Sequence, residues 1–375
     1  MGEASGSYIT IDYIHNIDVV RGSRHSPGLP ETEGSLLFSF TVRKIRCRAM
    51  PQTGLPCGGP DYTQLGYHLG TTSVQTIPSP SMANPSRLFR RLLRRVRRHD
   101  WRCLIAYSAL ILLSASIFLY LLLAYYLAGD PRLVPHTIQQ ARNVLLVTAH
   151  PDDETLFFSP TILHGRDNPD VTRSLLVLST GDYHGQGDIR KAEIERSCAA
   201  LGISSARCVV LEHGALQDNP EKWWRQDVIQ DIVAHYVHMW KVDLIFTFDN
   251  GGVSGHINHR AVSAGVRKYA EDFPHAPPVY ALQSTFILRK YSSLVDLILT
   301  SVPFAWRIGA AVLTAAPAPT GHDIYGNRAL LVSPWQTYLT ARTAFSQHDS
   351  QYSWDRVLYL VVSRYMWFNN LYRIA

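Results

Sequence analysis

The stretch LLVTAHPDDETLFF, residues 145 to 158, joins a run of strand-forming apolar residues to a proline and three acidic residues. Residues 143–149, NVLLVTA, are apolar on both faces, which is typical of a strand buried in a parallel sheet. A buried strand gains nothing from polar side chains at its end. The His-Pro-Asp-Asp-Glu cluster over residues 150–154 therefore indicates a site at the carboxyl end of this strand.

Strand and helix patterns alternate along the rest of the chain. We expect further strands at 174–180, 207–212, 243–248 and 279–282, and helices at 188–203, near 222–239 and near 258–271. Asp188 is the expected N-cap of the first of these helices, and Gly202 its stop. This order predicts an α/β domain over residues 140–375, with a Rossmann-like, doubly wound and mostly parallel sheet.

The composition excludes several classes of protein. Of 375 residues, 46% are apolar and 18% are charged, which suits a sizeable core and neither a collagen-like nor a wholly disordered chain. The net charge of +6 comes with eight arginines between residues 87 and 102, directly before an apolar run. That position indicates a membrane edge with anionic headgroups, and we expect no nucleic-acid partner.

The apolar run CLIAYSALILLSASIFLYLLLAYYLA, residues 103–128, holds 26 residues without a charge. An α-helix needs about 20 residues to cross the hydrocarbon core, so this segment predicts one transmembrane helix. A cleaved signal peptide is the weaker alternative, because the run is long and deep in the chain. Residues 82–102 form its basic flank, and residues 1–81 are expected to be a disordered extension, with Met82 as an alternative start.

The cysteines lie at positions 47, 57, 103, 198 and 208, without C-x-x-C spacing. Only two of them follow the apolar run. We therefore expect no disulfide framework, and a reducing compartment is compatible with the sequence.

Two motifs at strand ends carry metal-ligand spacing. His150 and Asp153 are three apart, and His256 and His259 repeat this spacing within FDNGGVSGHINHR, residues 248–260. Each motif alone also fits a polar cap or a helix N-terminus. Together they supply the two imidazoles and one carboxylate of a catalytic zinc site with a position left for water. A hard cation such as Mg²⁺ is the alternative, although it rarely selects imidazole.

These motifs also carry a family resemblance. The segments AHPDDE, TGDYHGQGDIRKAEIERSCAALGI, FDNGGVSGHINH, LQSTFILRKY and AFSQHDSQYSW resemble those of LmbE-type de-N-acetylases. They are most similar to the eukaryotic branch that deacetylates N-acetylglucosaminyl-phosphatidylinositol in glycosylphosphatidylinositol anchor synthesis. The resemblance covers residues 103–375 and implies an LmbE-like fold and Zn²⁺ as cofactor, with another divalent metal as the alternative.

The resemblance implies a role for each motif residue. His150, Asp153 and His259 would bind the metal, and Asp152 would be the general base. His256 would steady the oxyanion or protonate the leaving amine, and as a non-ligand we expect it to titrate near neutrality.

Two further positions match family motifs that hold substrate. Arg190 suits the phosphate of a phosphoinositide, with a surface arginine as the plainer alternative. His348 is retained in the late motif, whereas Phe345 and Asp355 depart from it, which affects packing more than chemistry.

The implied substrate is a glycolipid, so the protein is expected to work at a membrane, and no protein partner is identifiable. Residues 291–316 are apolar but interrupted by Asp296, Pro303 and Arg307. They predict an interfacial or re-entrant helix pair or, equally, a core helix.

Other functions remain open at this point. A deacetylase of another N-acetylated sugar conjugate is one alternative, and a non-catalytic sugar-lipid binding protein is another. The side of the membrane on which the catalytic domain lies has two conflicting indications. The arginines before the span place the catalytic domain in the lumen, whereas the family implies a cytosol-facing domain on the endoplasmic reticulum. We favour the cytosolic side.

Overall fold

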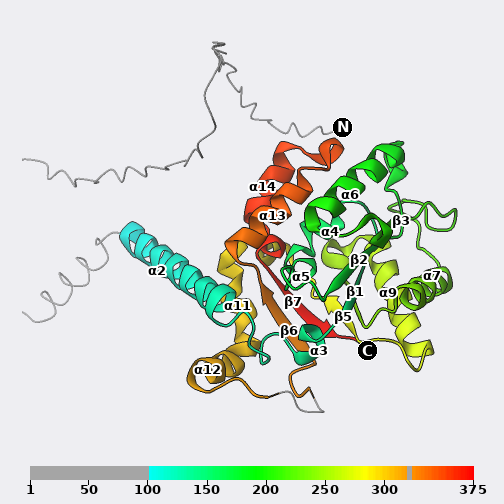
Figure 1. The fold of residues 1–375 in the computed structure, drawn as a ribbon. Coiled ribbons are helices and arrows are strands. Elements are labelled where there is room, and N and C mark those ends of the chain that lie inside the picture. Colours follow the sequence, from blue (N-terminus) through cyan, green and yellow to red (C-terminus); the bar gives the residue numbers. More distant parts are fainter. Residues whose placement is uncertain (1–100, 319–322) are drawn as a thin grey trace, which may run out of the picture. The chain divides into compact units, whose positions relative to one another are not determined.

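The computed structural model describes residues 101–318 and 323–375 (Figure 1). The elements below all belong to the unit formed by residues 81–375. The predicted disordered extension over 1–81 and most of the basic flank over 82–102 lie outside the described residues.

A mixed seven-stranded sheet forms the centre of the domain, in the order β3-β2-β1-β4-β5-β7-β6. Strands β1 to β5 are parallel to one another, and β7 runs antiparallel to both β5 and β6. The strands are β1 Asn143–Thr148, β2 Thr172–Val177, β3 Cys208–Val210, β4 Leu244–Phe248, β5 Val279–Leu282, β6 Arg328–Val332 and β7 Phe368–Arg373.

Helices cover both faces of this sheet (Figure 1). The two long helices α7 and α9 pack against each other on one face, while α6 and α13 pack together with α4 and α5 on the other. The helices of the sheet domain are α3 His136–Gln139, α4 Asp153–Leu156, α5 Ser159–Ile162, α6 Gly187–Leu201, α7 Gln226–Trp240, α8 Gly252–Gly255, α9 Ile257–Asp272, α10 Ile287–Lys290, α13 Trp335–Phe345 and α14 Trp354–Val362. This arrangement confirms the predicted doubly wound, mostly parallel fold.

The site is positioned by the point where the strand order reverses. From β1 the chain moves outward to β2 and β3, then returns to pair β4 with the other side of β1. Helices on either side of that point diverge and leave a crevice beyond the carboxyl ends of β1 and β4. His150 follows the end of β1, and Asp249 follows the end of β4.

Predicted and observed elements differ mainly at their ends. Helix α6 has Gln186, and not Asp188, at its N-cap position, whereas Gly202 does end it in a left-handed conformation with a φ of 78°. The antiparallel pair β6 and β7 was not predicted. Both strands lie in the last fifty residues, and helices α13 and α14 separate β6 from β7 along the chain.

The predicted membrane segment is helical. Helix α2, Trp101–Leu121, continues into a π-helical turn over Leu122–Tyr126, and this segment is long and apolar enough to cross a membrane. Within the described residues, Ser293–Leu313 also meets that criterion. It contains α11 Asp296–Ser301 and α12 Ala305–Leu313, joined by a 3-10 turn at Val302–Phe304.

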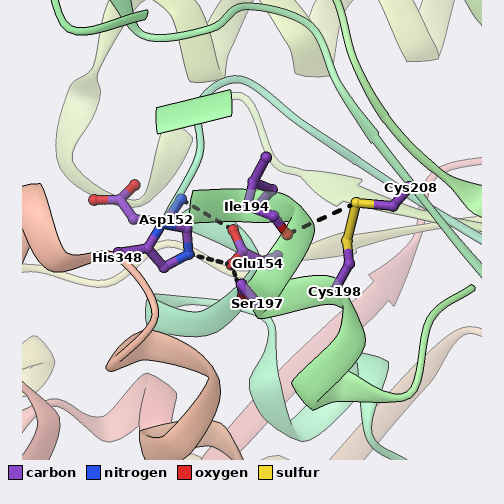
Figure 2. The surroundings of a disulfide bond; sticks show 7 residues. All are labelled: Asp152, Glu154, Ile194, Ser197, Cys198, Cys208 and His348. Atoms are coloured by element: carbon purple, nitrogen blue, oxygen red, sulfur yellow. Dashed lines mark hydrogen bonds and ion pairs between the residues drawn. A yellow bond between two sulfur atoms is a disulfide. The ribbon is translucent and has the colours of Figure 1, made fainter. Parts of the chain in front are cut away.

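The expectation that the cysteines form no disulfide is wrong for Cys198 and Cys208, which are bonded (Figure 2). A short connection after Gly202 brings the last turn of α6 against the edge strand β3, with the two Cα atoms 6.3 Å apart. A spacing of ten residues is not a metal-binding signature, and no local pattern marks this tertiary contact.

Candidate metal centre and pocket

The turn after β1 is held by one carboxylate. Oδ2 of Asp153 accepts the backbone N–H of Ala149 at 3.1 Å and that of His150 at 2.8 Å. These bonds close the turn and leave Oδ1 of Asp153 facing the side chain of His259, at 3.2 Å from its Nε2. The carboxylate is 2% exposed, so its geometry is set by the protein and not by solvent.

Asp152 adopts a strained backbone in the same turn, with a φ of 119°. Non-glycine residues seldom occupy this region, and such strain is common where a side chain must be aimed at a site. Asp152 is 8% exposed and lines the pocket. Burial and the charge of Asp153 raise the pKa of Asp152 to about 7, against the opposing charge of Arg356. A carboxylate with that pKa suits a general base near neutral pH.

The second motif loop follows β4 and is fixed by Asp249. Oδ1 of this buried side chain accepts the N–H groups of Gly251 and Gly252, and Oδ2 accepts that of Ser284 at 2.7 Å. Gly252 has a φ of 56°, and a Cβ there would lie 2.9 Å from Cβ of His259. The loop ends at His256, the N-cap position of α9, which places His259 on the first turn of that helix.

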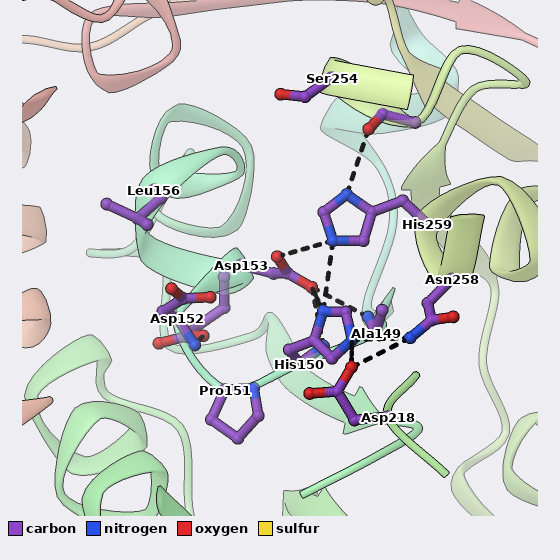
Figure 3. Close-up of polar contacts among 12 residues, drawn as sticks. Ala149, His150, Pro151, Asp152, Asp153, Leu156, Asp218, Ser254, Asn258 and His259 are labelled. Carbon is purple, nitrogen blue, oxygen red and sulfur yellow. Dashed lines mark hydrogen bonds and ion pairs between the residues drawn. The ribbon is translucent and has the colours of Figure 1, made fainter. Parts of the chain in front are cut away.

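Three ligand atoms converge where the two loops meet (Figure 3). Nδ1 of His150 lies 3.3 Å from Nε2 of His259. Of the Asp153 carboxylate, Oδ2 lies 3.7 Å from Nδ1 of His150, and Oδ1 lies 3.2 Å from Nε2 of His259. Ligands on a tetrahedral zinc ion, with bonds of about 2.0–2.2 Å, stand about 3.4 Å apart. The predicted metal set therefore fits such an ion in both spacing and donor type.

The outer ring nitrogen of each imidazole has an acceptor, which leaves the inner nitrogen with its lone pair toward the site. Nε2 of His150 lies 3.1 Å from Oδ1 of Asp218, and Nδ1 of His259 lies 3.1 Å from the carbonyl oxygen of Gly252. Donating to these acceptors leaves Nδ1 of His150 and Nε2 of His259 free for a metal. The Asn258 amide also donates to Asp218, at 3.2 Å.

The electrostatics of the site favour a cation. Burial opposes protonation of His150, but Asp218, Asp153 and Asp152 outweigh it and raise the pKa of His150. Burial likewise opposes ionisation of Asp153, yet His259 and His150 lower the pKa of Asp153 to about 2. A buried carboxylate held ionised among imidazoles is the environment in which a divalent metal replaces protons.

His256 lies beside the same point and is a second candidate for the third ligand. Its ring centroid is 4.7 Å from that of His259 and 5.0 Å from that of His150, and the three imidazoles could hold an ion. Burial and the two neighbouring imidazoles lower the pKa of His256 to about 4. The prediction that His256 titrates near neutrality is therefore wrong for this geometry, and the ring is neutral at pH 7.

A pocket of about 820 Å³ opens above these groups, and the sheet edge forms its floor. Three basic side chains line it, namely Arg190, Lys290 and Arg356. Nε of Arg190 is buried without a hydrogen-bond partner in the described structure, as expected of a group that awaits an acceptor from a ligand. Arg190 thus lies where the sequence placed it, in the pocket wall.

Lys290 and Arg356 were not predicted as site residues. Nζ of Lys290 donates to Ser254 at 2.6 Å and lies about 5.4–5.5 Å above the rings of Phe157, Tyr291 and Tyr359. Burial and the charge of Arg356 lower the pKa of Lys290 to about 8. Nη2 of Arg356 is 3.9 Å from Oδ2 of Asp152, close enough to influence the base.

His348 does not lie in the pocket wall, in contrast to the predicted substrate contact. It is fully buried, and its Nε2 lies 2.8 Å from Oε1 of Glu154 (Figure 2). Burial disfavours charge on this ring, but Glu154 more than offsets that effect and raises the pKa of His348. Oε2 of Glu154 accepts the N–H of Asp152 at 3.0 Å, so His348 supports the base from beneath.

Asp218 was also missed by sequence reasoning. It lies in the irregular loop between β3 and α7, eight residues after the strand ends. A lone aspartate in LQDNP has no spacing that marks it as a partner of His150. The only available signal was that loops after parallel strands gather at the same edge of the sheet.

Comparisons with known proteins identify a family of de-N-acetylases. A family model described as PIG-L, GlcNAc-PI de-N-acetylase, matches residues 145–270. The N-acetylglucosaminyl-phosphatidylinositol de-N-acetylase of Bos taurus is 39% identical over 229 residues, which cover 60% of this chain and 81% of the bovine protein. The Saccharomyces cerevisiae protein of that name is 30% identical over 241 residues, which cover 60% and 79%.

Among solved structures, a match is the N,N'-diacetylchitobiose deacetylase from Pyrococcus horikoshii complexed with its inhibitor. Its sequence identity is 16% and its TM-score 0.40, and the match covers 68% of this chain and 90% of that chain.

The ligand geometry predicts how substitutions affect metal binding. Asp153→Ala and His259→Ala should each weaken zinc binding by about 10²-fold or more, because each removes one of three convergent donors. His256→Ala should bind zinc within about threefold of the unsubstituted protein. Competitive titration of the metal-free protein with a zinc indicator measures all three affinities.

A substitution behind a metal ligand, with a smaller expected effect, serves as the control. Asp218→Ala should weaken zinc binding by about 10- to 100-fold, the usual effect of losing a carboxylate behind a ligating histidine. If His256→Ala lost the metal and Asp153→Ala retained it, the three imidazoles would be the ligands and the assignment would be wrong.

Proposed function

This chain belongs to the PIG-L family of N-acetylglucosaminyl-phosphatidylinositol de-N-acetylases, and we propose that a zinc ion held by His150, Asp153 and His259 is its working centre. The protein is a hydrolase that cleaves the acetamide of N-acetylglucosaminyl-phosphatidylinositol. The products are acetate and glucosaminyl-phosphatidylinositol, in the deacetylation step of glycosylphosphatidylinositol anchor synthesis. The convergence of the three ligand atoms beside Asp152 carries the proposal.

Asp152 is the base and then the acid of the reaction. When bound, zinc supplies a Lewis acid that polarises the acetamide carbonyl and eases the loss of a proton from water. Asp152 accepts that proton as the water oxygen bonds to the carbonyl carbon. It then donates the proton to the amine nitrogen as the C–N bond breaks, which leaves acetate and a free amine.

His256 acts as a neutral hydrogen-bond donor. Because its pKa is lowered to about 4, it carries no extra proton to deliver at neutral pH. A neutral imidazole can still donate one N–H to the oxygen that becomes negative as the tetrahedral carbon forms. Of the two roles that the motif leaves open, oxyanion stabilisation is therefore the one we assign to it.

The basic wall of the pocket suits the phosphate of the substrate. Arg190 lies partly buried with an unpartnered Nε, and Lys290 and Arg356 also line the pocket. An inositol phosphate bears a negative charge that such a wall binds through charge-assisted hydrogen bonds. We assign Arg190 to substrate binding, and His348 to the support of the base through Glu154.

The location follows from the substrate and from α2. The protein is placed at a membrane, and we assign it to the endoplasmic reticulum, with α2 as a single span and the catalytic domain on the cytosolic side. The arginine block before α2 and the bond between Cys198 and Cys208 favour the opposite orientation. For the orientation of the catalytic domain, we give greater weight to the cytosolic side that the family implies.

Acetate release tests the reaction. Full-length protein in detergent should release acetate from N-acetylglucosaminyl-phosphatidylinositol, and a chelator should abolish release because the ligand set then holds no Lewis acid. Adding zinc back should restore it. Full activity of a protein shown by elemental analysis to be free of metal would contradict the proposal.

The raised pKa of Asp152 predicts a pH dependence. The base is active when ionised, so kcat/KM should fall as the pH drops through the pKa of Asp152, which burial and the charge of Asp153 raise and which a bound zinc ion would lower. Asp152→Asn should lower kcat by about 10²- to 10⁴-fold. Arg356→Gln should move the acidic limb to higher pH, since a nearby cation lowers this pKa.

Stability separates a catalytic effect from misfolding. The folded pKa of Asp152 lies above its ordinary value, so its ionisation costs folding free energy as the pH rises from about 4 through 7. Metal-free Asp152→Asn should therefore be at least as stable as the unsubstituted protein at pH 8. A large loss of stability in urea would show instead that the substitution damages the fold.

Orientation is tested in sealed microsomes. Protease added outside should digest the catalytic domain, because the assigned orientation exposes it to the cytosol. Cys198 and Cys208 should then be free thiols, since the cytosol keeps thiols reduced. Because Cys198 is buried, they are alkylated after the cells are quenched in acid and the protein is denatured. A protected domain with an intact bond between these cysteines would place the domain in the lumen.

A further inference from the structure

The part of α2 that is exposed on all sides is too short to cross a bilayer alone. Every side chain from Trp101 to Ala115 is exposed. Beyond Ala115, Ser116 and Tyr120 are buried against the domain, while Ile117, Phe118 and Leu121 stay exposed on the other side of the helix. At 1.5 Å per residue, the part exposed on all sides is about 22 Å long, and the hydrocarbon core is about 30 Å thick. The preceding sequence RRVRRHD, residues 94–100, is too charged to supply the difference.

The rest of the hydrocarbon thickness must be crossed by the part of α2 that packs on the domain. The carboxyl half of α2 contacts α11 and the 3-10 turn at Ser293–Val295 (Figure 1). Elements at that level must therefore lie at hydrocarbon or headgroup depth. Their outward side chains suit that position, since Leu299, Val302 and Trp306 are exposed, Trp306 by 85%.

The same apolar surface continues to the mouth of the catalytic pocket. Oγ of Ser293 donates to the carbonyl oxygen of Val361 at 3.0 Å, and the rings of Tyr291 and Tyr359 meet edge to face at 5.9 Å. These contacts join the turn beside α2 to helix α14. The pocket is lined by residues on both sides of this junction.

We call this surface the apolar rim. On α14 its members recur at intervals of four and three residues, which places them on one helix face. At α10 they are three consecutive exposed residues. The rim consists of Phe286, Ile287, Leu288, Leu299, Val302, Trp306, Trp354, Leu358 and Val361.

Charge beneath the rim matches a phospholipid surface. Lys290 lies two residues after the last of the exposed apolar residues of α10, and Arg356 lies between Trp354 and Leu358 on α14. Both basic residues line the pocket, and the exposed side chains of Trp354 and Leu358 line it beside Arg356. In a bilayer, phosphates lie just outside the hydrocarbon, so apolar side chains with cations beside them suit this boundary.

We propose that the apolar rim docks on the bilayer that holds α2, so that the pocket opens directly onto the membrane surface. The glycan and phosphate of the substrate then enter the pocket while its acyl chains stay among the lipids. This inference rests on the proposed function for the lipid substrate. It adds a second membrane contact, separate from the span, that determines access to the active site.

The test compares embedded and soluble substrates. Full-length protein is reconstituted in phosphatidylcholine vesicles and given either N-acetylglucosaminyl-phosphatidylinositol or its water-soluble analogue without acyl chains. The rim variant is Ile287→Ser with Leu288→Ser, two positions outside the pocket lining. The matched control is Met239→Ser with Phe273→Ser, which are similarly apolar and exposed but belong to α7 and the end of α9.

The rim variant should lose about tenfold or more in kcat/KM for the embedded substrate and change less than about twofold for the soluble one. The control should match the unsubstituted protein on both. Equal activity of all variants on embedded substrate would overturn the inference, as would an equal loss on both substrates. A loss that appears only in native microsomes, and not in pure lipid vesicles, would assign the rim to a protein partner and also overturn it.

The experiment also distinguishes failure of the proposed function from failure of membrane docking. If the unsubstituted protein released acetate from neither substrate, the assigned reaction would be wrong whatever the rim contacts. If it cleaved both substrates and the rim variant cleaved both equally well, the reaction would stand and only membrane docking would fail.

Discussion

The site depends on the two oxygens of Asp153, which make different contacts. Oδ2 accepts two backbone N–H groups and so closes the turn after β1, which leaves Oδ1 directed at His259. The same turn positions His150 and forces Asp152 into its left-handed conformation. Without this buried carboxylate, the turn would lose its closure and the ligands their common point. In the proposed site, one side chain therefore both closes the turn and offers an oxygen to the metal.

A second buried carboxylate connects the base to the rest of the domain. Glu154 accepts hydrogen bonds from the N–H of Asp152, from Ser197 on α6 and from His348 before α14. Ser197 adjoins Cys198, which is bonded to Cys208 in this structure (Figure 2). The backbone of Asp152 is thus held through Glu154 by segments on one face of the sheet, while its side chain lines the pocket.

Much of the parallel sheet and the catalytic motifs could be predicted, because local patterns encode them. Apolar runs indicate buried strands, and polar residues at their ends indicate a site at the shared edge. Contacts between distant segments were not encoded in this way. The sequence around Asp218, Lys290 and Arg356 has no diagnostic spacing, and a family position alone could not show that His348 is buried. The bond between Cys198 and Cys208 likewise depends on tertiary packing.

The central claim is that two imidazoles and one carboxylate hold the catalytic metal. Zinc-edge X-ray absorption on the metal-loaded, full-length protein measures the identity and distance of these donors directly. The account predicts two imidazole nitrogens and two oxygens at about 2.0–2.2 Å, one oxygen from Asp153 and one from water. Loss of an oxygen in Asp153→Ala, with the imidazole signal unchanged in His256→Ala, would complete the assignment. A spectrum with three imidazoles, one of which disappears in His256→Ala, would contradict it.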